Sequence, residues 1–182
     1  MYPEEPELLR LAQAGVPEAF DRLVERLTPG LYRMIRRMMP DRAEAEAVVQ
    51  ETWLRAWKAR RGLEPSRPAF PWLARIAANA ARDYWRKRRP IDFADVESQA
   101  DDLADVAAGP ELRLEMDEAR RRMAALVENL RPEWRMILAL RYDGNLSYKE
   151  IADALSVPLN TVRTHLRRAL LALRSALEAD DA

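Results

Sequence analysis

The sequence predicts an all-α protein: two small helical domains joined by an acidic flexible linker, the second domain ending in a helix-turn-helix. Apolar residues recur with a period near 3.6 along most of the chain, and no stretch alternates as a strand would. Gly is scarce, with 5 of 182 residues, which leaves few helix breakers. A single internal segment interrupts the periodicity, and it divides the chain in two.

Four helices are expected before the interruption and four after it. Their ranges are 4–14, 17–39, 42–60 and 68–88, followed by 110–129, 132–143, 147–155 and 159–177. The segment between Pro90 and Pro110 has six acidic residues and neither Lys nor Arg, a composition typical of a mobile linker. We therefore expect domains at 1–89 and 111–182, with the linker at 90–110.

Composition excludes several classes of site. The chain has no Cys and one His, so disulfides, thiolate metal sites and His-based zinc sites are not expected, and neither is a cofactor. No apolar run approaches the roughly 20 residues of a membrane span, and the N-terminus is acidic, unlike a signal peptide. A cytoplasmic location is expected. Residues 1–90 hold 18 basic and 12 acidic residues, and an acidic segment follows them, which suggests two surfaces with different partners. The alternative is a charge-neutral globular protein with random charged patches.

The C-terminal part carries a helix-turn-helix pattern. Ser147 and Glu150 have the spacing of a capping box, and a turn at 156–158 separates this short helix from a longer one. Asn160 is expected to cap the longer helix. On that helix the apolar face comprises Val162, Leu166, Ala169, Leu173 and Leu177.

The opposite face of this helix is predicted to show Arg163, Thr164, Arg167 and Arg174, and no acid occurs between Asp153 and Glu178. A basic helix after a short helix and a tight turn suits the DNA major groove. The alternative is an ordinary helical hairpin with a solvated Arg face. His165 beside this face either contacts DNA or is packed in the protein.

The helix predicted at 68–88 has a second basic stripe. Leu73, Ile76, Ala77, Ala80 and Tyr84 form its apolar face, and the opposite stripe consists of Trp72, Arg75, Asn79, Arg82 and Arg86. Aromatic rings that stack on bases, with cations that follow the backbone, are typical of single-stranded nucleic acid binding. The alternative is a solvated basic helix.

The helix predicted at 42–60 has Val49, Trp53, Ala56 and Trp57 on its apolar face. Its opposite side includes Gln50, Glu51, Leu54 and Arg55, and a Leu exposed among charges suggests a protein interface. The alternative is an ordinary solvated face, because single exposed Leu residues are normal. Glu44, Glu46 and Glu51 also lie on this helix and could be paired carboxylates of an enzyme. They have no His or Cys nearby, so catalysis is not expected.

Three blocks of sequence resemble sigma factors of the extracytoplasmic-function group. They are VVQETWLRAW, FPWLARIAANAARDYWRKRR and LRPEWRMILALRYDGNLSYKEIADALSVPLNTVRTHLRRAL. Their order and spacing, with an acidic linker between them, make the resemblance specific, and it covers nearly the whole chain. The resemblance implies a non-enzymatic subunit that binds core RNA polymerase and directs promoter-specific transcription initiation. A free-standing helix-turn-helix regulator, which would need a dimer surface and a palindromic site, is the alternative.

The resemblance also assigns residues to roles. Gln50, Glu51, Leu54 and Arg55 match the polymerase-binding block. Trp72, Arg75, Asn79, Arg82 and Arg86 match the block that melts and reads the −10 element, and loop 62–69 matches the pocket for a flipped base. Asn160, Arg163, Thr164, Arg167 and Arg168 match the block that reads the −35 element. An anti-sigma protein is a further partner that the resemblance implies.

The spacing of the two predicted readers fits a promoter. Two elements about 20 base pairs apart lie roughly 65 Å apart at about 3.4 Å per pair. Fully extended, the linker at 90–110 reaches roughly the same distance. The linker is therefore just long enough for two separate readers to reach both elements, and the resemblance implies that polymerase anchors both domains.

Overall fold

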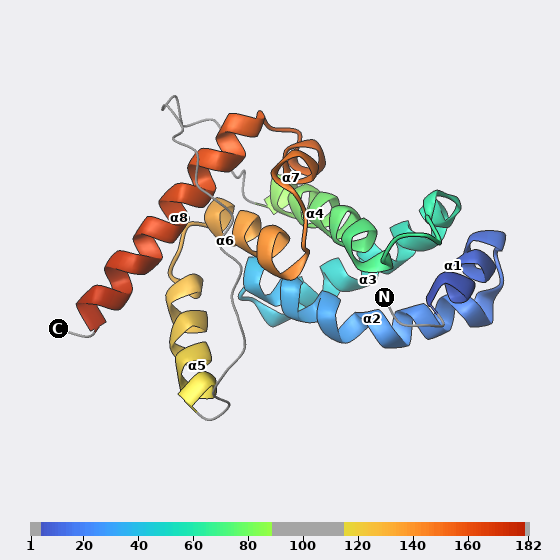
Figure 1. Ribbon diagram of the computed structural model, residues 1–182, viewed down its shortest axis with the longest axis horizontal. Helices are drawn as coiled ribbons and strands as arrows, with labels where there is room; N and C mark the ends of the chain where they lie inside the picture. Colours follow the sequence, from blue (N-terminus) through green and yellow to red (C-terminus); the bar gives the residue numbers. More distant parts are fainter. Residues whose placement is uncertain (1–4, 89–114, 181–182) are drawn as a thin grey trace.

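The computed structural model describes residues 5–88 and 115–180, and every regular element in these ranges is helical (Figure 1). The N-terminal unit consists of α1 (Glu5–Ala14), α2 (Pro17–Met38), α3 (Arg42–Ala59), the 3-10 turn η1 (Arg60–Gly62) and α4 (Ala69–Arg88). The C-terminal unit consists of α5 (Glu115–Glu128), α6 (Pro132–Leu138), η2 (Ala139–Asp143), α7 (Tyr148–Leu155) and α8 (Leu159–Asp180). The all-α prediction is confirmed. The predicted linker, 90–110, lies outside the described residues.

Local sequence explains where the first helices begin and end. Gly15 adopts a φ of 92°, a left-handed conformation that Gly accepts without strain and that ends α1. Pro17 then occupies the first turn of α2, where its missing N–H costs nothing. Asp41 caps α3, since its Oδ1 accepts a hydrogen bond from the Glu44 amide over 2.9 Å.

The helix-turn-helix is built partly as predicted. The capping box on α7 is confirmed: the Glu150 amide donates to Ser147 Oγ over 3.3 Å, and the Ser147 amide donates to Glu150 Oε2 over 2.9 Å. The prediction that Asn160 caps the next helix is wrong. The chain already enters α8 at Leu159, and the Pro158 carbonyl accepts the first helical hydrogen bond, so Asn160 lies inside the first turn.

The helix predicted at 132–143 is not uniform. Its second half widens into the π-helical η2, and the Gly144 amide donates to the Ala139 carbonyl five residues back, over 2.9 Å. A Cβ on Gly144 would lie 2.7 Å from the Leu140 carbonyl oxygen and 3.1 Å from the Ala74 Cβ. Gly is therefore required here by close approach, both within η2 and against α4.

One apolar cluster runs through both units. The C-terminal unit packs on the N-terminal unit, with α7 against α4 and both α6 and η2 against α2 (Figure 1). The predicted apolar face of α4 packs inward, but a second line of α4, Ala74, Ala78 and Ala81, is also fully buried. Ala74 lies close to Gly144, and α4 packs against α7. Helical periodicity predicted one buried face of α4. The contact with the C-terminal unit buries the second face, which periodicity did not predict.

Candidate nucleic-acid and polymerase interfaces

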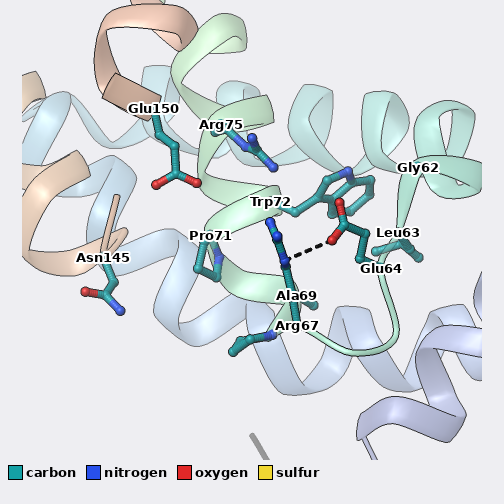
Figure 2. A pocket seen from close by; sticks show the side chains of 11 residues that line it. Gly62, Leu63, Glu64, Arg67, Ala69, Pro71, Trp72, Arg75, Asn145 and Glu150 are labelled. Atoms are coloured by element: carbon teal, nitrogen blue, oxygen red, sulfur yellow. Dashed lines mark ion pairs between the residues drawn. The ribbon is translucent and has the colours of Figure 1, made fainter. Parts of the chain in front are cut away.

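The stripe predicted on α4 leads into a pocket. Trp72 and Arg75, both half-buried, line a cavity of about 180 Å³ together with the loop between η1 and α4 (Figure 2). The remaining lining residues are Gly62, Leu63, Glu64, Arg67, Pro68, Ala69, Pro71, Asn145 and Glu150. The loop at 62–69, which the resemblance assigned to a flipped base, is thus part of a real concavity beside the stripe.

The pocket is lined by both positively and negatively charged side chains. Arg67 Nε lies 3.0 Å from Glu64 Oε2 across the loop, as the dashed line in Figure 2 marks. Glu150 reaches the same pocket from α7, and its carboxyl pKa is lowered. The Ser147 backbone amide makes the largest contribution, and the positive charges of Arg75 and Arg67 add to it. The pocket therefore combines an indole, guanidinium groups and carboxylates.

The rest of the stripe follows α4 away from the pocket. The Asn79 side-chain amide is half-buried and donates from Nδ2 to the Arg75 carbonyl over 3.2 Å. Arg82 Nη1 donates to Ser156 Oγ over 2.9 Å and lies 3.4 Å from the Ala154 carbonyl oxygen. Arg86 is exposed and lies 3.3 Å from Asp83 Oδ1. The five predicted residues share one side of α4, and α7 holds one of them, Arg82.

The predicted polymerase surface on α3 borders an apolar groove. Gln50 and Leu54 are exposed, Leu54 by 59%, and they line a groove of about 610 Å³ between α2 and α3. Trp53 and Trp57 form its α3 side. Phe20 lies edge-on to both rings, at centroid distances of 5.8 and 5.0 Å. An exposed Leu at the mouth of an aromatic groove is typical of a protein-binding surface.

The charged members of this surface are held by ion pairs. Arg55 Nε donates to Glu51 Oε1 over 2.6 Å, and Arg55 Nη1 donates to Asp83 Oδ2 over 2.8 Å. The hydrogen bond that Arg55 donates to Glu51, followed by the one that it donates to Asp83, raises the pKa of Arg55. Glu51 is exposed and remains accessible, whereas Arg55 links α3 to α4.

The reading face predicted on α8 needs one correction. Arg163, Arg167 and Arg168 are exposed, as is Asn160. Thr164, predicted to point outward, is only 5% exposed, and its hydroxyl donates to the Asn160 carbonyl over 2.9 Å. The outward placement of Thr164 is therefore wrong. Next to it, His165 is 3% exposed and packed in the protein rather than presented on the surface.

Sequence reasoning missed several members of these surfaces. Pro17, Phe20, Asp21 and Val24 of α2 line the groove beside α3, and Asn145 and Glu150 line the pocket beside α4. Apolar residues at i and i+4, Phe20 and Val24, could have indicated the first group. No sequence signal indicated the second, because it comes from a unit distant along the chain.

In residues 5–88 and 115–180, no group of three or more His, Cys, Asp or Glu side chains could hold a metal ion. Across the same ranges, no helix combines the length and hydropathy that a membrane span requires.

Family comparisons match both units. The family model described as Sigma-70 region 2 matches residues 23–91, which include α3 and the α4 stripe. The model described as Sigma-70, region 4 matches residues 120–173, which include the helix-turn-helix. Two matched regions in this order do not favour a free-standing regulator.

Whole-chain relatives give the same result. The chain is 31% identical to the RNA polymerase sigma-H factor of Pseudomonas aeruginosa over 184 residues, covering 96% of this chain and 94% of the relative. It is 29% identical to the ECF RNA polymerase sigma-E factor of Escherichia coli K12, covering 94% and 93%.

A solved structure of CnrH in complex with the cytosolic domain of CnrY aligns with a TM-score of 0.62 at 26% identity, covering 97% of this chain and 99% of that chain. The sigma factor RpoE of Bartonella quintana, solved with the anti-sigma factor NepR, shares the fold at a TM-score of 0.57 and 22% identity, covering 88% and 98%. From these matches and the helices that carry them, this chain belongs to the extracytoplasmic-function group of sigma factors, which direct promoter-specific initiation by RNA polymerase.

Proposed function

We propose that this sigma factor divides its work among three surfaces and performs no catalysis of its own. The α3 surface binds core RNA polymerase, the α4 stripe with its pocket holds the melted −10 strand, and the outer face of α8 reads the −35 element. The N-terminal domain, 1–89, carries the first two surfaces, and the C-terminal domain, 111–182, carries the third. The protein works in the cytoplasm, where polymerase and promoter DNA are found.

The pocket beside α4 is the observation that carries the proposal. Trp72 offers a ring on which an unpaired base can stack, and Arg75 offers a cation for the adjoining phosphate. Asn79 lies one turn further along the same side of α4, where its amide can hydrogen-bond a base edge. Flipping a base costs a few kcal/mol, which stacking and hydrogen bonds in such a pocket offset.

The −35 surface rests on exposed guanidinium groups. Arg163, Arg167 and Arg168 are exposed near the start of α8, and Asn160 is exposed in its first turn. Arg can bind guanine edges with two hydrogen bonds, and it can also bind phosphates without reading sequence. Thr164 is not included in this surface because its side chain is buried.

The polymerase surface combines exposed Gln50, Glu51 and Leu54 with the groove between α2 and α3. Arg55 supports this surface by fixing α3 to α4 through Asp83. An anti-sigma protein is a further partner. CnrH, which is 26% identical to this chain, was solved in complex with the cytosolic domain of another protein, CnrY.

Overproduction of the chain in a bacterial host, followed by sequencing of transcript 5′ ends, tests the function as a whole. We expect a set of start sites sharing one −10 and one −35 element. Gel filtration with core RNA polymerase tests binding directly. Absence of co-elution, or new transcripts with no shared element, would contradict the proposal.

A further inference from the structure

The loop that forms one wall of the pocket has little support from its own residues. Within residues 62–68 only Leu63 is buried, and the others are exposed or half-buried. The Leu63 amide donates to the Arg60 carbonyl over 3.0 Å. The Arg67 amide donates to the Glu64 carbonyl over 3.0 Å and closes a second turn. An exposed segment of this kind needs contacts from outside the loop to keep a single shape.

The first helix, α1, supplies such a contact at each end of the loop. At its start, Gln13 Nε2 donates to the Leu63 carbonyl over 2.9 Å and to the Arg61 carbonyl over 3.2 Å. At its end, the Ala69 amide donates to Glu5 Oε1 over 2.9 Å, and Glu5 is only 4% exposed. Leu63 and Ala69 both line the pocket. Two side chains of α1 are therefore bonded to the backbone of the pocket wall.

The bond to Glu5 also sets where α4 begins. Ala69 is the first residue of α4, so its amide is one of the N–H groups that have no acceptor within the helix. The Glu5 carboxylate accepts this N–H from 64 positions away, and a negative charge is favourable at a helix N-terminus. Trp72 and Arg75 of the pocket follow in the first two turns of α4. Glu5 therefore supports both the loop and the start of the helix that carries the stripe.

The helix that makes these contacts is itself anchored. Leu8, Leu9 and Ala12 of α1 are buried in the apolar cluster, and α1 packs on both α2 and η1 (Figure 1). Glu5 and Gln13 are separated by eight positions, which is about 12 Å along a helix axis at about 1.5 Å per residue. α1 therefore fixes the separation of the two points at which it holds the loop.

We infer that Glu5 and Gln13 are positioning residues, which hold the loop at 62–69 in the shape that distinguishes one unpaired base from the others. The inference rests on the proposed function of the pocket. Neither side chain is among those that line the pocket, so both act through the loop and not on DNA. Glu64 and Arg67, whose polar groups can bind a base edge, lie between the two held points (Figure 2).

A fixed loop improves base selection for two physical reasons. A pocket that keeps its shape leaves the polar groups of a wrong base without partners, whereas a loop that can move adapts to several bases. A loop that is free before binding also loses conformational entropy when it closes on a base, which weakens the binding of every base. Loss of the α1 contacts should therefore lower the preference for one base as well as the affinity.

Four variants of α1 test this role. Gln13→Leu removes the donor at the start of the loop, and Glu5→Leu removes the acceptor at its end. Glu5→Gln keeps an oxygen that can accept from the Ala69 amide, so it should remain close to the parent protein. Glu7→Leu is the matched control, because Glu7 is exposed on the same helix and pairs with Arg10 over 2.7 Å.

Hydrogen exchange on the free, full-length protein measures the loop without DNA or polymerase. Peptides covering residues 61–69 should exchange roughly fivefold faster in Gln13→Leu and Glu5→Leu than in the parent protein. Glu5→Gln and Glu7→Leu should stay close to the parent. Peptides from α2 are the reference, because a general loss of stability in the N-terminal unit raises exchange there too. Unchanged exchange in the loop would overturn the inference.

Base selection is measured on holoenzyme assembled from core RNA polymerase and each variant. The probe is a promoter fragment from the strongest mapped start site, with its −10 strand unpaired and each of the four bases placed in turn at each −10 position. At one position, the parent's preference for a base should fall roughly three- to tenfold in Gln13→Leu and Glu5→Leu. The −35 preference and the affinity for core polymerase should stay unchanged, which a merely destabilised domain would not allow.

Failure of the inference and failure of the proposed function give different results. A parent protein that prefers no base at any −10 position contradicts the proposed function of the pocket, and the positioning role falls with it. A parent that prefers a base, with the same preference in Gln13→Leu, overturns the positioning role alone. Equal losses at the −10 and −35 elements, or a Glu5→Gln protein as impaired as Glu5→Leu, also overturn it. If Glu5→Leu does not fold, Gln13→Leu gives the same test from the other end of the loop.

Discussion

The Arg55 guanidinium on α3 donates to the Asp83 carboxylate on α4 over 2.8 Å and joins two helices with different proposed roles. The hydrogen bond from Arg55 is the largest cause of the lowered pKa of Asp83, and the charges of Arg55, Arg86 and Arg82 act in the same direction. The pair thus fixes the proposed polymerase surface relative to the stripe that we propose holds the −10 strand.

This ion pair should make stability depend on pH. The folded-state pKa of Asp83 lies below its ordinary value of 3.8, so its contribution is complete above that value and is lost as pH falls through the folded-state pKa. Asp83→Asn should cost about 1 kcal/mol at pH 7, since both groups are partly exposed and water screens the pair. Urea unfolding between pH 7 and 2.5 measures this. The two curves should converge at low pH, and parallel curves would contradict the role of the pair.

Asn79→Ala should weaken open-complex formation more than polymerase binding. The substitution removes the amide that can bind a base edge, while the surface on α3 stays intact. Permanganate reactivity of unpaired thymines measures strand opening, and gel filtration with core polymerase measures assembly. Equal losses in both assays would count against a role in base recognition.

Arg163→Ala and Arg167→Ala should each cost about 1–3 kcal/mol of binding at promoters with the matched −35 element. Both side chains are exposed near the start of α8. Holoenzyme binding to matched and scrambled −35 sequences separates base reading from phosphate contact. Arg10→Ala is the control, because Arg10 is an exposed arginine of α1, outside the α8 face, and pairs with Glu7 over 2.7 Å. An unchanged −35 preference in both variants would refute the assignment.

Leu54→Asp should reduce affinity for core polymerase by roughly tenfold or more, because it places a charge at the mouth of an apolar groove. Leu54 is 59% exposed, so the fold should tolerate the change. Leu171→Asp on α8 is the matched control, since Leu171 is 52% exposed and lies outside the groove. Similar losses in the two variants would show that the groove is not the binding surface.

Gly144→Ala should lower the free energy of unfolding by about 1–3 kcal/mol, because a Cβ there lies too close to the Leu140 carbonyl oxygen. Gly62→Ala is a suitable control, since the nearest atom to its Cβ would be Trp72 Nε1 at 3.8 Å. Urea unfolding of the three proteins distinguishes the sites. An unchanged free energy of unfolding in Gly144→Ala would contradict this prediction, because it would mean that η2 can shift to accommodate the Cβ without loss of stability.

Helical periodicity and capping signals in the sequence were enough to predict most of the secondary structure. They gave the helices to within a few residues, the capping box of Ser147 and Glu150, and the exposed positions of Leu54, Arg163 and Arg167. These features depend on residues three to four positions apart, which a helix brings together by itself. Local sequence is therefore sufficient to predict them.

Tertiary structure decided what those faces contact. The second buried line of α4, the hydrogen bond from Arg82 to Ser156 and the arrival of Glu150 at the pocket all join segments about 70 residues apart. The burial of Thr164 likewise contradicts its helical phase. The sequence pattern of one helix shows which of its sides is apolar. It does not show which distant helix packs against the opposite side. Only the packed fold therefore showed that part of the predicted reading stripe is covered.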